Sequence, residues 1–161
     1  MSMMMISALP SSPLGMILIE SDASQIHRIS LVPPGSAEIS DPGTMSMPAA
    51  EAVAQLEAYF DGRSDRFDLP LAPASTARGE ALRRAIVDIP PGETRSYGEV
   101  ARLAASSPRA VGQACARNPF PIVVPCHRVL GTGGAIGHYS AGDGVATKRW
   151  LLEHERRGGL L

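Results

Sequence analysis

The stretch "SSPRAVGQACARNPFPIVVPCHRVL", residues 106–130, combines the start of a helix with a proline-interrupted approach to a cysteine. Ser107 followed by Pro108 is typical of an N-cap and a first helical position. Prolines further along prevent a long helix, because each one removes a backbone donor and clashes with the preceding turn. We therefore predict a short helix and then an extended segment, "PIVVP" at 121–125, that ends at Cys126.

A second short helix is expected immediately before this stretch. "SYGEVARLAA", residues 96–105, places Val100, Leu103 and Ala104 on one helical face. Two short helices separated by a tight break are typical of a helix-turn-helix, in which the second helix would begin with Arg109 at the DNA groove. Five arginines accompany a single glutamate between residues 95 and 130. The spacing and the charge together indicate a DNA-binding element.

The first half of the chain predicts a small α/β domain. "GMILIESDASQIHRISLV", residues 15–32, is typical of a β-hairpin, and a loop rich in Pro, Gly and Ser follows at 33–48. Residues 48–62 have helical spacing, and residues 66–76 form an extended linker interrupted by prolines. No residue pattern in this half indicates chemistry. We predict two domains, residues 1–74 and 75–161.

Three further segments complete the second half. Residues 77–93 predict a helix that ends at the Pro-Pro-Gly of 90–92, and residues 131–144 form a glycine-rich loop. Residues 145–157, "VATKRWLLEHERR", predict a final helix that buries Trp150, Leu151 and His154.

The totals fit an ordinary globular protein. The chain has 161 residues, of which 44% are hydrophobic and 19% charged, and no window approaches a membrane span. The amino terminus lacks the basic residues of a signal peptide, so we expect a cytoplasmic protein. We also expect a monomer. Two cysteines are too few for a structural zinc site, and we expect no metal and no cofactor.

The net charge of −1 conceals an asymmetry between the two halves. Residues 1–74 contain three basic and nine acidic residues, a balance of −6, whereas residues 75–161 contain twelve and seven, a balance of +5. Such a division favours a polyanionic partner for the second half. The alternative is that the arginines are scattered without a common partner.

Cys126 has two interpretations on spacing alone. A cysteine reacts as its thiolate, and the adjacent His127 could accept its proton while a carboxylate orients the imidazole. Glu153 and Glu155 on the last helix both offer that carboxylate, and spacing does not choose between them. Alternatively, Cys126 is a small buried hydrophobic residue. For Cys115, on the predicted second helix, we expect packing.

The segment "NPFPIVVPCHRVL" resembles the signature of the O6-alkylguanine-DNA alkyltransferase family, in which a Pro-Cys-His-Arg core contains the acceptor cysteine. "PGETRSYGEVARL", "RAVGQACARNP", "GHYSAG" and "TKRWLLEHE" resemble further family segments in the family's order. The resemblance implies an α+β fold, with a ribonuclease H-like N-terminal domain and a helical winged helix-turn-helix domain. It also implies direct repair of double-stranded DNA: an alkylated guanine is flipped out, and its alkyl group passes once and irreversibly to the protein.

The resemblance also implies roles for individual residues. Cys126 would be the acceptor, His127 its base through a water, Glu155 the partner of His127, and Asn118 the brace of the active-site turn. Residues expected at the DNA are Arg109, which replaces the flipped base, Tyr97, Ala110 and Arg128. Residues expected around the base are Tyr139, Ser140, Lys148 and the backbone of Val129. On other grounds, Lys148 could simply cover an apolar surface with its stem.

The sequence departs from the family in the helix at 77–93, where Phe, Gln and Trp are usual and Arg78, Gly79 and Arg83 are present here. Two rival functions are weighed against alkyl transfer: a module that binds alkylated guanine without transfer, and a cysteine hydrolase. The first does not require Cys126. The second gives no role to the arginine-rich helix-turn-helix.

Overall fold

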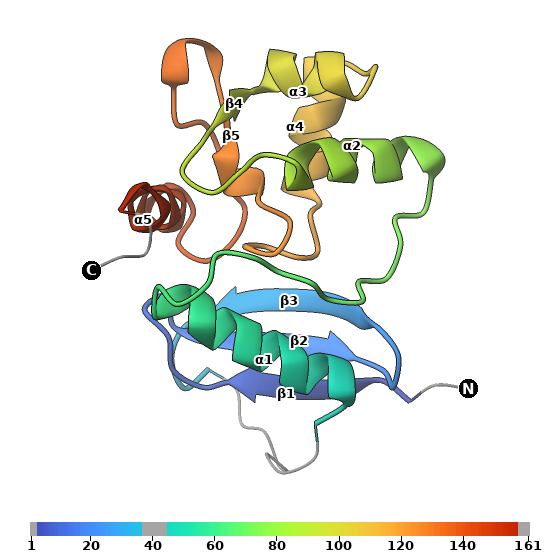
Figure 1. Cartoon of the computed structure of the whole chain (residues 1–161), viewed down its shortest axis with the longest axis vertical. Coiled ribbons are helices and arrows are strands. Elements are labelled where there is room, and N and C mark those ends of the chain that lie inside the picture. Colours follow the sequence, from blue (N-terminus) through green and yellow to red (C-terminus); the bar gives the residue numbers. More distant parts are fainter. Residues whose placement is uncertain (1–2, 37–44, 158–161) are drawn as a thin grey trace. The chain divides into compact units, whose positions relative to one another are not determined.

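The chain divides into two units, one ending at Ala72 and the other beginning at Pro73, in a computed structural model that describes residues 3–36 and 45–157 (Figure 1). Its mixture of helices and sheet confirms the predicted α+β class. Within the described residues, no helix is long and apolar enough to cross a membrane.

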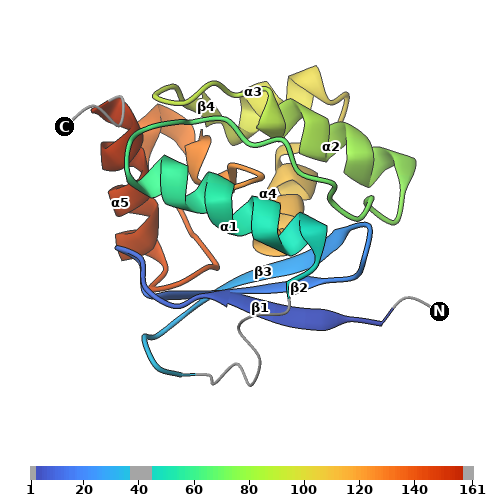
Figure 2. The ribbon, with the colours of Figure 1, turned by 60° about the horizontal axis from the view of Figure 1, so that its bottom comes forward.

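The first unit is a three-stranded antiparallel sheet with one helix. The strands are β1 (Met5–Leu9), β2 (Met16–Ser21) and β3 (Ile26–Val32), in the order β1-β2-β3, and the helix is α1 (Met47–Phe60). Figures 1 and 2 show α1 along one face of this sheet. The hairpin between β2 and β3 confirms the sequence prediction. Strand β1 was not predicted.

Alternation along β2 explains how helix and sheet pack. Ile17 and Ile19 are fully buried, and so are Ala52 and Leu56 on α1. Since side chains alternate across a strand, Ser21 shares the face of these isoleucines, and its hydroxyl is hydrogen-bonded to Ser46, the N-cap of α1, at 2.8 Å. The start of α1 is therefore fixed to the sheet. The predicted loop at 33–48 lies partly outside the described residues, and its last two residues already belong to α1.

Part of the predicted linker at 66–76 pairs with strand β3. Ile26 donates its backbone N–H to Pro70 and accepts one from Ala72, both at 2.8 Å, so Leu71 pairs with Ile26 as a parallel bridge. Prolines do not prevent this pairing because neither Pro70 nor Pro73 has to donate to it.

The second unit contains four helices among its described residues, two short 3₁₀ helices and a two-stranded parallel sheet. Their bounds are α2 (Ala77–Val87), β4 (Arg95–Ser96), α3 (Tyr97–Leu103), α4 (Pro108–Ala116), η1 (Cys126–Arg128), β5 (Val129–Leu130), η2 (Thr132–Gly134) and α5 (Val145–Arg156). The sheet pairs Arg95 with Val129 and Ser96 with Leu130. The sheet thus joins the start of α3 to the segment that follows Cys126.

Side-chain caps define the predicted helix-turn-helix. Ser96 and Glu99 form a capping box at the start of α3, and the Ser107 hydroxyl accepts the Ala110 N–H at 3.1 Å at the start of α4. Between the helices, Ala105 adopts a left-handed φ of 53°. These caps confirm both predicted helices, because each satisfies backbone donors that the first turn leaves without partners.

Three side chains were placed incorrectly by periodicity. Leu103 is 64% exposed, because the buried face of α3 runs through Val100 and Ala101 instead. Trp150 and His154 are half-buried and stack on each other with ring centroids 4.8 Å apart, whereas Leu151 is buried as predicted. In a short helix, the same apolar spacing fits either of two adjacent faces, so the spacing does not identify which face is buried.

Replacing Ser107 by Ala should lower the free energy of unfolding by about 1 kcal/mol, because the Ala110 N–H loses its side-chain acceptor. Urea denaturation followed by circular dichroism measures the change. The neighbouring substitution Ser106→Ala, which removes a hydroxyl that does not cap α4, is the control. Equal losses in both variants would contradict the assigned cap.

Candidate active site

A tight turn, not an extended strand, delivers Cys126. Asn118 spans it: the side-chain amide donates to Val124 O, and the side-chain oxygen accepts the Phe120 N–H, both at 2.9 Å. Val124 also donates its N–H to Phe120 O at 2.9 Å, and Ile122 takes a left-handed φ of 75°. The prediction of an extended "PIVVP" was therefore wrong. Hydrogen bonds across residues 118–124 outweigh the extended preference of β-branched residues.

Cys126 opens η1 in a nearly closed environment. The residue is 3% exposed. The neighbouring Cys115 thiol, on α4, and burial raise the pKa of Cys126 well above its usual range, although Asn118 and Lys148 oppose the shift. Cys126 therefore rests as a neutral thiol.

A buried ionic cluster follows directly on η1. His127 Nε2 lies 2.8 Å from Glu155 Oε2, and Arg128 reaches both oxygens of the same carboxylate at 2.8 and 2.9 Å. Arg128 also donates to Ile89 O at 2.6 Å. The side chains of His127, Arg128 and Glu155 are all buried. The helix α5 is thus connected to η1 through one carboxylate that two consecutive residues share.

Burial and hydrogen bonding set the charges of this cluster. Burial would raise the pKa of Glu155, but the hydrogen bonds and charges of His127 and Arg128 bring that pKa far below its usual range. Burial lowers the pKa of His127, and Glu155 offsets this only in part. The imidazole is therefore neutral near pH 7 and donates its single proton from Nε2 to Glu155. Its Nδ1, buried and without a hydrogen-bond partner among the described residues, then carries a lone pair.

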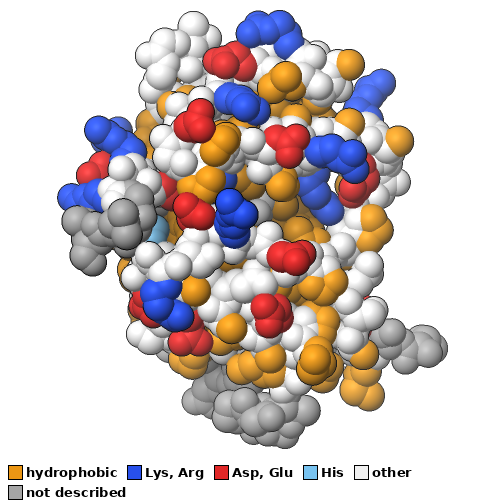
Figure 3. All heavy atoms as spheres, in the orientation of Figure 1, with side chains coloured by type: hydrophobic (Ala, Val, Ile, Leu, Met, Phe, Trp, Pro, Cys, Tyr) orange, Lys and Arg blue, Asp and Glu red, His pale blue; other side chains and the backbone are white. Residues whose placement is uncertain are grey.

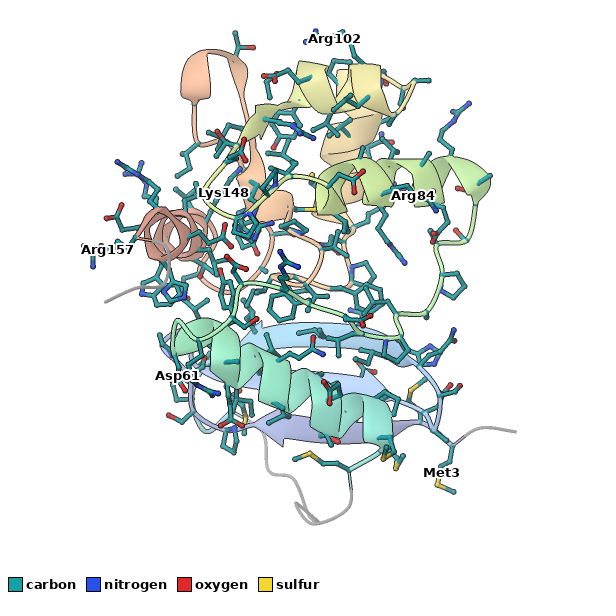
Figure 4. The ribbon with its side chains drawn as sticks, in the orientation of Figure 1. Met3, Asp61, Arg84, Arg102, Lys148 and Arg157 are labelled. Carbon is teal, nitrogen blue, oxygen red and sulfur yellow. The ribbon has the colours of Figure 1, made fainter. Side chains whose placement is uncertain are left out.

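Lys148 is buried beside the thiols. It is 0% exposed, and its Nζ donates to Val129 O at 2.8 Å and to His138 O at 3.5 Å (Figure 4). Burial lowers the pKa of Lys148, and the charges of Cys115 and Cys126 act in the opposite direction. A lysine that merely covers an apolar surface would keep its ammonium in water, so that alternative is wrong.

Two tyrosines, Tyr97 and Tyr139, also belong to this site. A β-carbon on Gly137 would lie 3.5 Å from Tyr97 Oη and 3.6 Å from Lys148 Nζ, so these three residues meet. Tyr139 is buried, with a hydroxyl that finds no partner among the described residues. Burial raises the pKa of both tyrosines, so each hydroxyl stays protonated and can donate. Ser140 is exposed.

Two cavities of this unit are lined by predicted site residues. One, of about 830 Å³, is lined by the start of α3, the start of α4 and the loop 130–134, and it brings Tyr97 and exposed Arg109 together. Ala110, beside Arg109, is half-buried. Cys126 is not in that lining. It lines the second cavity, of about 340 Å³, with Asn118, Arg83 and Arg117.

The structure bears on two sequence-based assignments. Arg128 was expected at the DNA, but it is buried against Glu155 and Ile89 O and does not reach the surface. Cys115 was assigned to packing, and it is half-buried on α4. Its position four residues after buried Val111 places it on the inner face of α4, a signal that helical spacing already contained.

Basic and acidic side chains lie side by side on one face of the second unit. On the face in Figure 3, basic side chains of the second unit are interspersed with acidic ones rather than gathered in a patch. Within the described residues, no group of three or more His, Cys, Asp or Glu side chains could hold a metal ion. The site itself offers the thiol of Cys126, the neutral imidazole of His127 and the buried carboxylate of Glu155.

Comparison with known proteins covers both units. Residues 79–157 match the DNA-binding domain of 6-O-methylguanine DNA methyltransferase, and residues 5–73 match its ribonuclease-like domain. A methylated-DNA–protein-cysteine methyltransferase of Methanosarcina acetivorans is 39% identical over 153 residues, which cover 92% of this chain and 96% of that protein.

Solved structures agree. Mycobacterium tuberculosis OGT in complex with DNA has a TM-score of 0.78 at 35% identity, with 95% of this chain and 93% of that chain covered. An O6-methylguanine DNA methyltransferase from Methanococcus jannaschii has a TM-score of 0.63 at 27% identity, with 88% of each chain covered.

Replacing Glu155 by Gln should lower the free energy of unfolding by about 3–5 kcal/mol, because Arg128 would lose its buried counterion. Glu153→Gln is the matched control on the same helix: Glu153 pairs with Arg157 and Arg156 at the surface, where its loss should cost no more than about 1 kcal/mol. Urea titration of both variants measures the difference. Similar losses would contradict the role given to the buried cluster.

Proposed function

The chain belongs to the 6-O-methylguanine DNA methyltransferase family, and we propose that Cys126 is the cysteine that takes the alkyl group from damaged DNA. The protein repairs DNA directly, by moving an alkyl group from O6-alkylguanine to one of its own cysteines. The single observation that supports Cys126 in this role is its position immediately before His127, whose neutral imidazole is held by buried Glu155.

Because the Cys126 thiol and the His127 imidazole are both neutral at rest, alkyl transfer requires the thiol to lose its proton. Cys126 rests as a thiol, and only its thiolate is an effective nucleophile. His127 Nδ1, with its lone pair, accepts the thiol proton through a water molecule. Glu155 then stabilises the imidazolium that forms. The positive charge of Lys148 favours the developing thiolate.

The transfer itself is a single displacement. The Cys126 sulfur attacks the alkyl carbon, a carbon–sulfur bond forms, and the bond between that carbon and guanine O6 breaks with its electron pair left on the guanine. Tyr97, whose raised pKa keeps its hydroxyl protonated, donates a hydrogen bond to the leaving base. A thioether has no ready leaving group, so each molecule acts once.

The remaining side chains position these groups. Asn118 fixes the turn that presents Cys126, and Tyr139 and Ser140 border the base. Lys148 fixes the Val129 carbonyl at the edge of the base pocket.

The helix-turn-helix binds the DNA. Arg109, exposed at the start of α4 and beside Tyr97, occupies the space that the flipped guanine leaves, and the backbone near Ala110 follows the groove. We further propose that residues 75–161 form the DNA-binding and transfer domain and that the protein works in the cytoplasm, where its cysteines stay reduced.

The decisive experiment is to incubate the protein with a duplex that contains one O6-methylguanine and to measure its intact mass. One added methyl group, mapped to the peptide 118–128 that contains Cys126, is expected, with none in Cys126→Ser. Binding without a change in mass would favour a lesion-binding module instead. Turnover of esters without methyl transfer would favour a hydrolase.

Arg109→Ala should slow transfer from duplex DNA about tenfold or more while changing the duplex dissociation constant far less, because flipping costs a few kcal/mol and binding rests on many phosphate contacts. Transfer from free O6-methylguanine base, which needs no flipping, is the internal control and should not change. Single-turnover rates and binding titrations provide both values. Equal losses in rate and affinity would contradict a flipping role.

A further inference from the structure

One side chain of α2 reaches the turn that presents Cys126. The guanidinium carbon of Arg83 lies over the Phe120 ring, 5.2 Å from its centroid. A cation within about 6 Å of a ring centroid is attracted to the electron-rich face of the ring. Phe120 is 1% exposed and the Arg83 side chain 18%, so water screens this attraction little. Arg83 is one of three residues in this helix that are unusual for the family, and the proposed mechanism gives it no role.

Phe120 is the residue on which the turn depends. Its N–H donates to Asn118 Oδ1, and its carbonyl oxygen accepts the Val124 N–H, each at 2.9 Å. The third hydrogen bond of the turn joins the Asn118 side-chain amide to Val124 O. Two of these three hydrogen bonds therefore end on the backbone of Phe120. A contact that holds the Phe120 ring also holds the backbone that places Cys126.

The turn borders a space that side chains do not fill. Asn118, Val124 and Cys126 line the cavity of about 340 Å³, and so does Arg83. A close-packed interior would hold the turn through contacts on every side, but no protein atom occupies this cavity. Packing on the cavity side therefore does not restrain the turn. The contact between Arg83 and Phe120 supplies part of the missing restraint.

Glu80, one helical turn earlier on α2, directs the guanidinium. Its Oε1 lies 3.5 Å from Arg83 Nη1 and also accepts the Ala74 N–H. Residues three apart on a helix are neighbours on its surface, so this ion pair forms within α2 itself. Because the carboxylate is also held by the backbone of Ala74, it keeps Arg83 over the Phe120 ring instead of in solvent.

We propose that Arg83 is a positioning residue for alkyl transfer: through Phe120, it fixes the turn that aligns the Cys126 sulfur with the alkyl carbon. This inference rests on the proposed function of Cys126 as the acceptor. Arg83 does not line the cavity that contains Tyr97 and Arg109, so it acts on the acceptor and not on the bound DNA. A misplacement of about 1 Å costs up to about a hundredfold in rate, so a small movement of the turn is enough.

Arg83→Met, which keeps the length of the side chain but removes the cation, should slow methyl transfer from a saturating O6-methylguanine duplex about tenfold. The exposed neighbour Arg84 provides the matched control, since Arg84→Met removes the same charge from the same helix. The duplex dissociation constants of these two variants should agree within about twofold. Transfer from the free O6-methylguanine base should slow in parallel with transfer from DNA, in contrast to Arg109→Ala.

Arg83→Lys keeps a cation for the ring and should retain at least about a third of the wild-type rate. Single-turnover kinetics and binding titrations give all of these values. The proposal is overturned if Arg83→Met transfers as fast as Arg84→Met, if weaker binding accounts for its slower transfer, or if Arg83→Lys is no faster than Arg83→Met.

Hydrogen exchange at single amides provides a readout that general destabilisation would not reproduce. In Arg83→Met, the amides of Phe120 and Val124 should exchange at least about tenfold faster than in the wild type, while that of buried Leu151 on α5 should match Arg84→Met. Equal acceleration at all three amides would assign Arg83 to the stability of the whole unit and overturn the positioning role. The measurement needs no DNA. If the wild type accepts no methyl group, the proposed function fails, and exchange at Phe120 and Val124 alone decides whether Arg83 holds the turn.

Glu80→Gln keeps the proposal testable if Arg83→Met does not fold. Glutamine still accepts the Ala74 N–H, so only the ion pair with Arg83 is lost. This variant should slow transfer about threefold and speed exchange at Phe120 and Val124, with Leu151 unchanged. A rate and an exchange pattern equal to those of the wild type would overturn the proposal.

Discussion

One buried carboxylate determines the geometry of the site. Glu155 accepts from His127 and Arg128, which are consecutive residues of η1, while Arg128 also holds Ile89 O. A buried carboxylate is tolerated only when its lone pairs are used, so α5 has one productive docking position against η1. That position orients the imidazole and, through the short helix, presents Cys126. The cluster of Glu155, His127 and Arg128 therefore positions the reacting side chains and also sets their protonation states.

The same burial sets every proton at the site. Cys126 and His127 rest neutral, while Glu155 keeps its charge, and the tyrosine hydroxyls remain donors. The site thus holds a nucleophile that is not yet ionised and a base that is not yet charged. A thiol that ionises only as its proton moves to His127 is protected from adventitious electrophiles until a substrate occupies the pocket. This protection matters because the acceptor cysteine is consumed in a single reaction.

Local signals in the sequence predicted the secondary structure best. Ser107 with Pro108, and the alternation around residues 15–32, each indicate an element through interactions within a few residues. Strand β1 was not predicted because its sequence, Met-Ile-Ser-Ala-Leu, does not alternate between apolar and polar residues, although it pairs with β2 as an adjacent hairpin. The turn before Cys126 was missed because Asn118 contacts Val124, six residues away, which no strand or helix period describes.

The site residues also divide into those that the sequence predicted and those whose environment only the structure shows. The resemblance named Cys126, His127 and Glu155, and the structure brings the last two together across 28 positions of the chain. Arg128 was expected at the DNA because a sequence does not show which arginines are buried.

The central claim is that His127 is a neutral imidazole with its proton on Nε2 and a lone pair on Nδ1. Nitrogen-15 NMR of histidine-labelled protein at pH 7 measures this directly. The structure predicts one protonated and one unprotonated ring nitrogen for His127, with the proton on Nε2 and with Glu155 still ionised. Two protonated ring nitrogens, or a proton on Nδ1, would contradict the account, because neither form could accept the proton of Cys126 at that nitrogen.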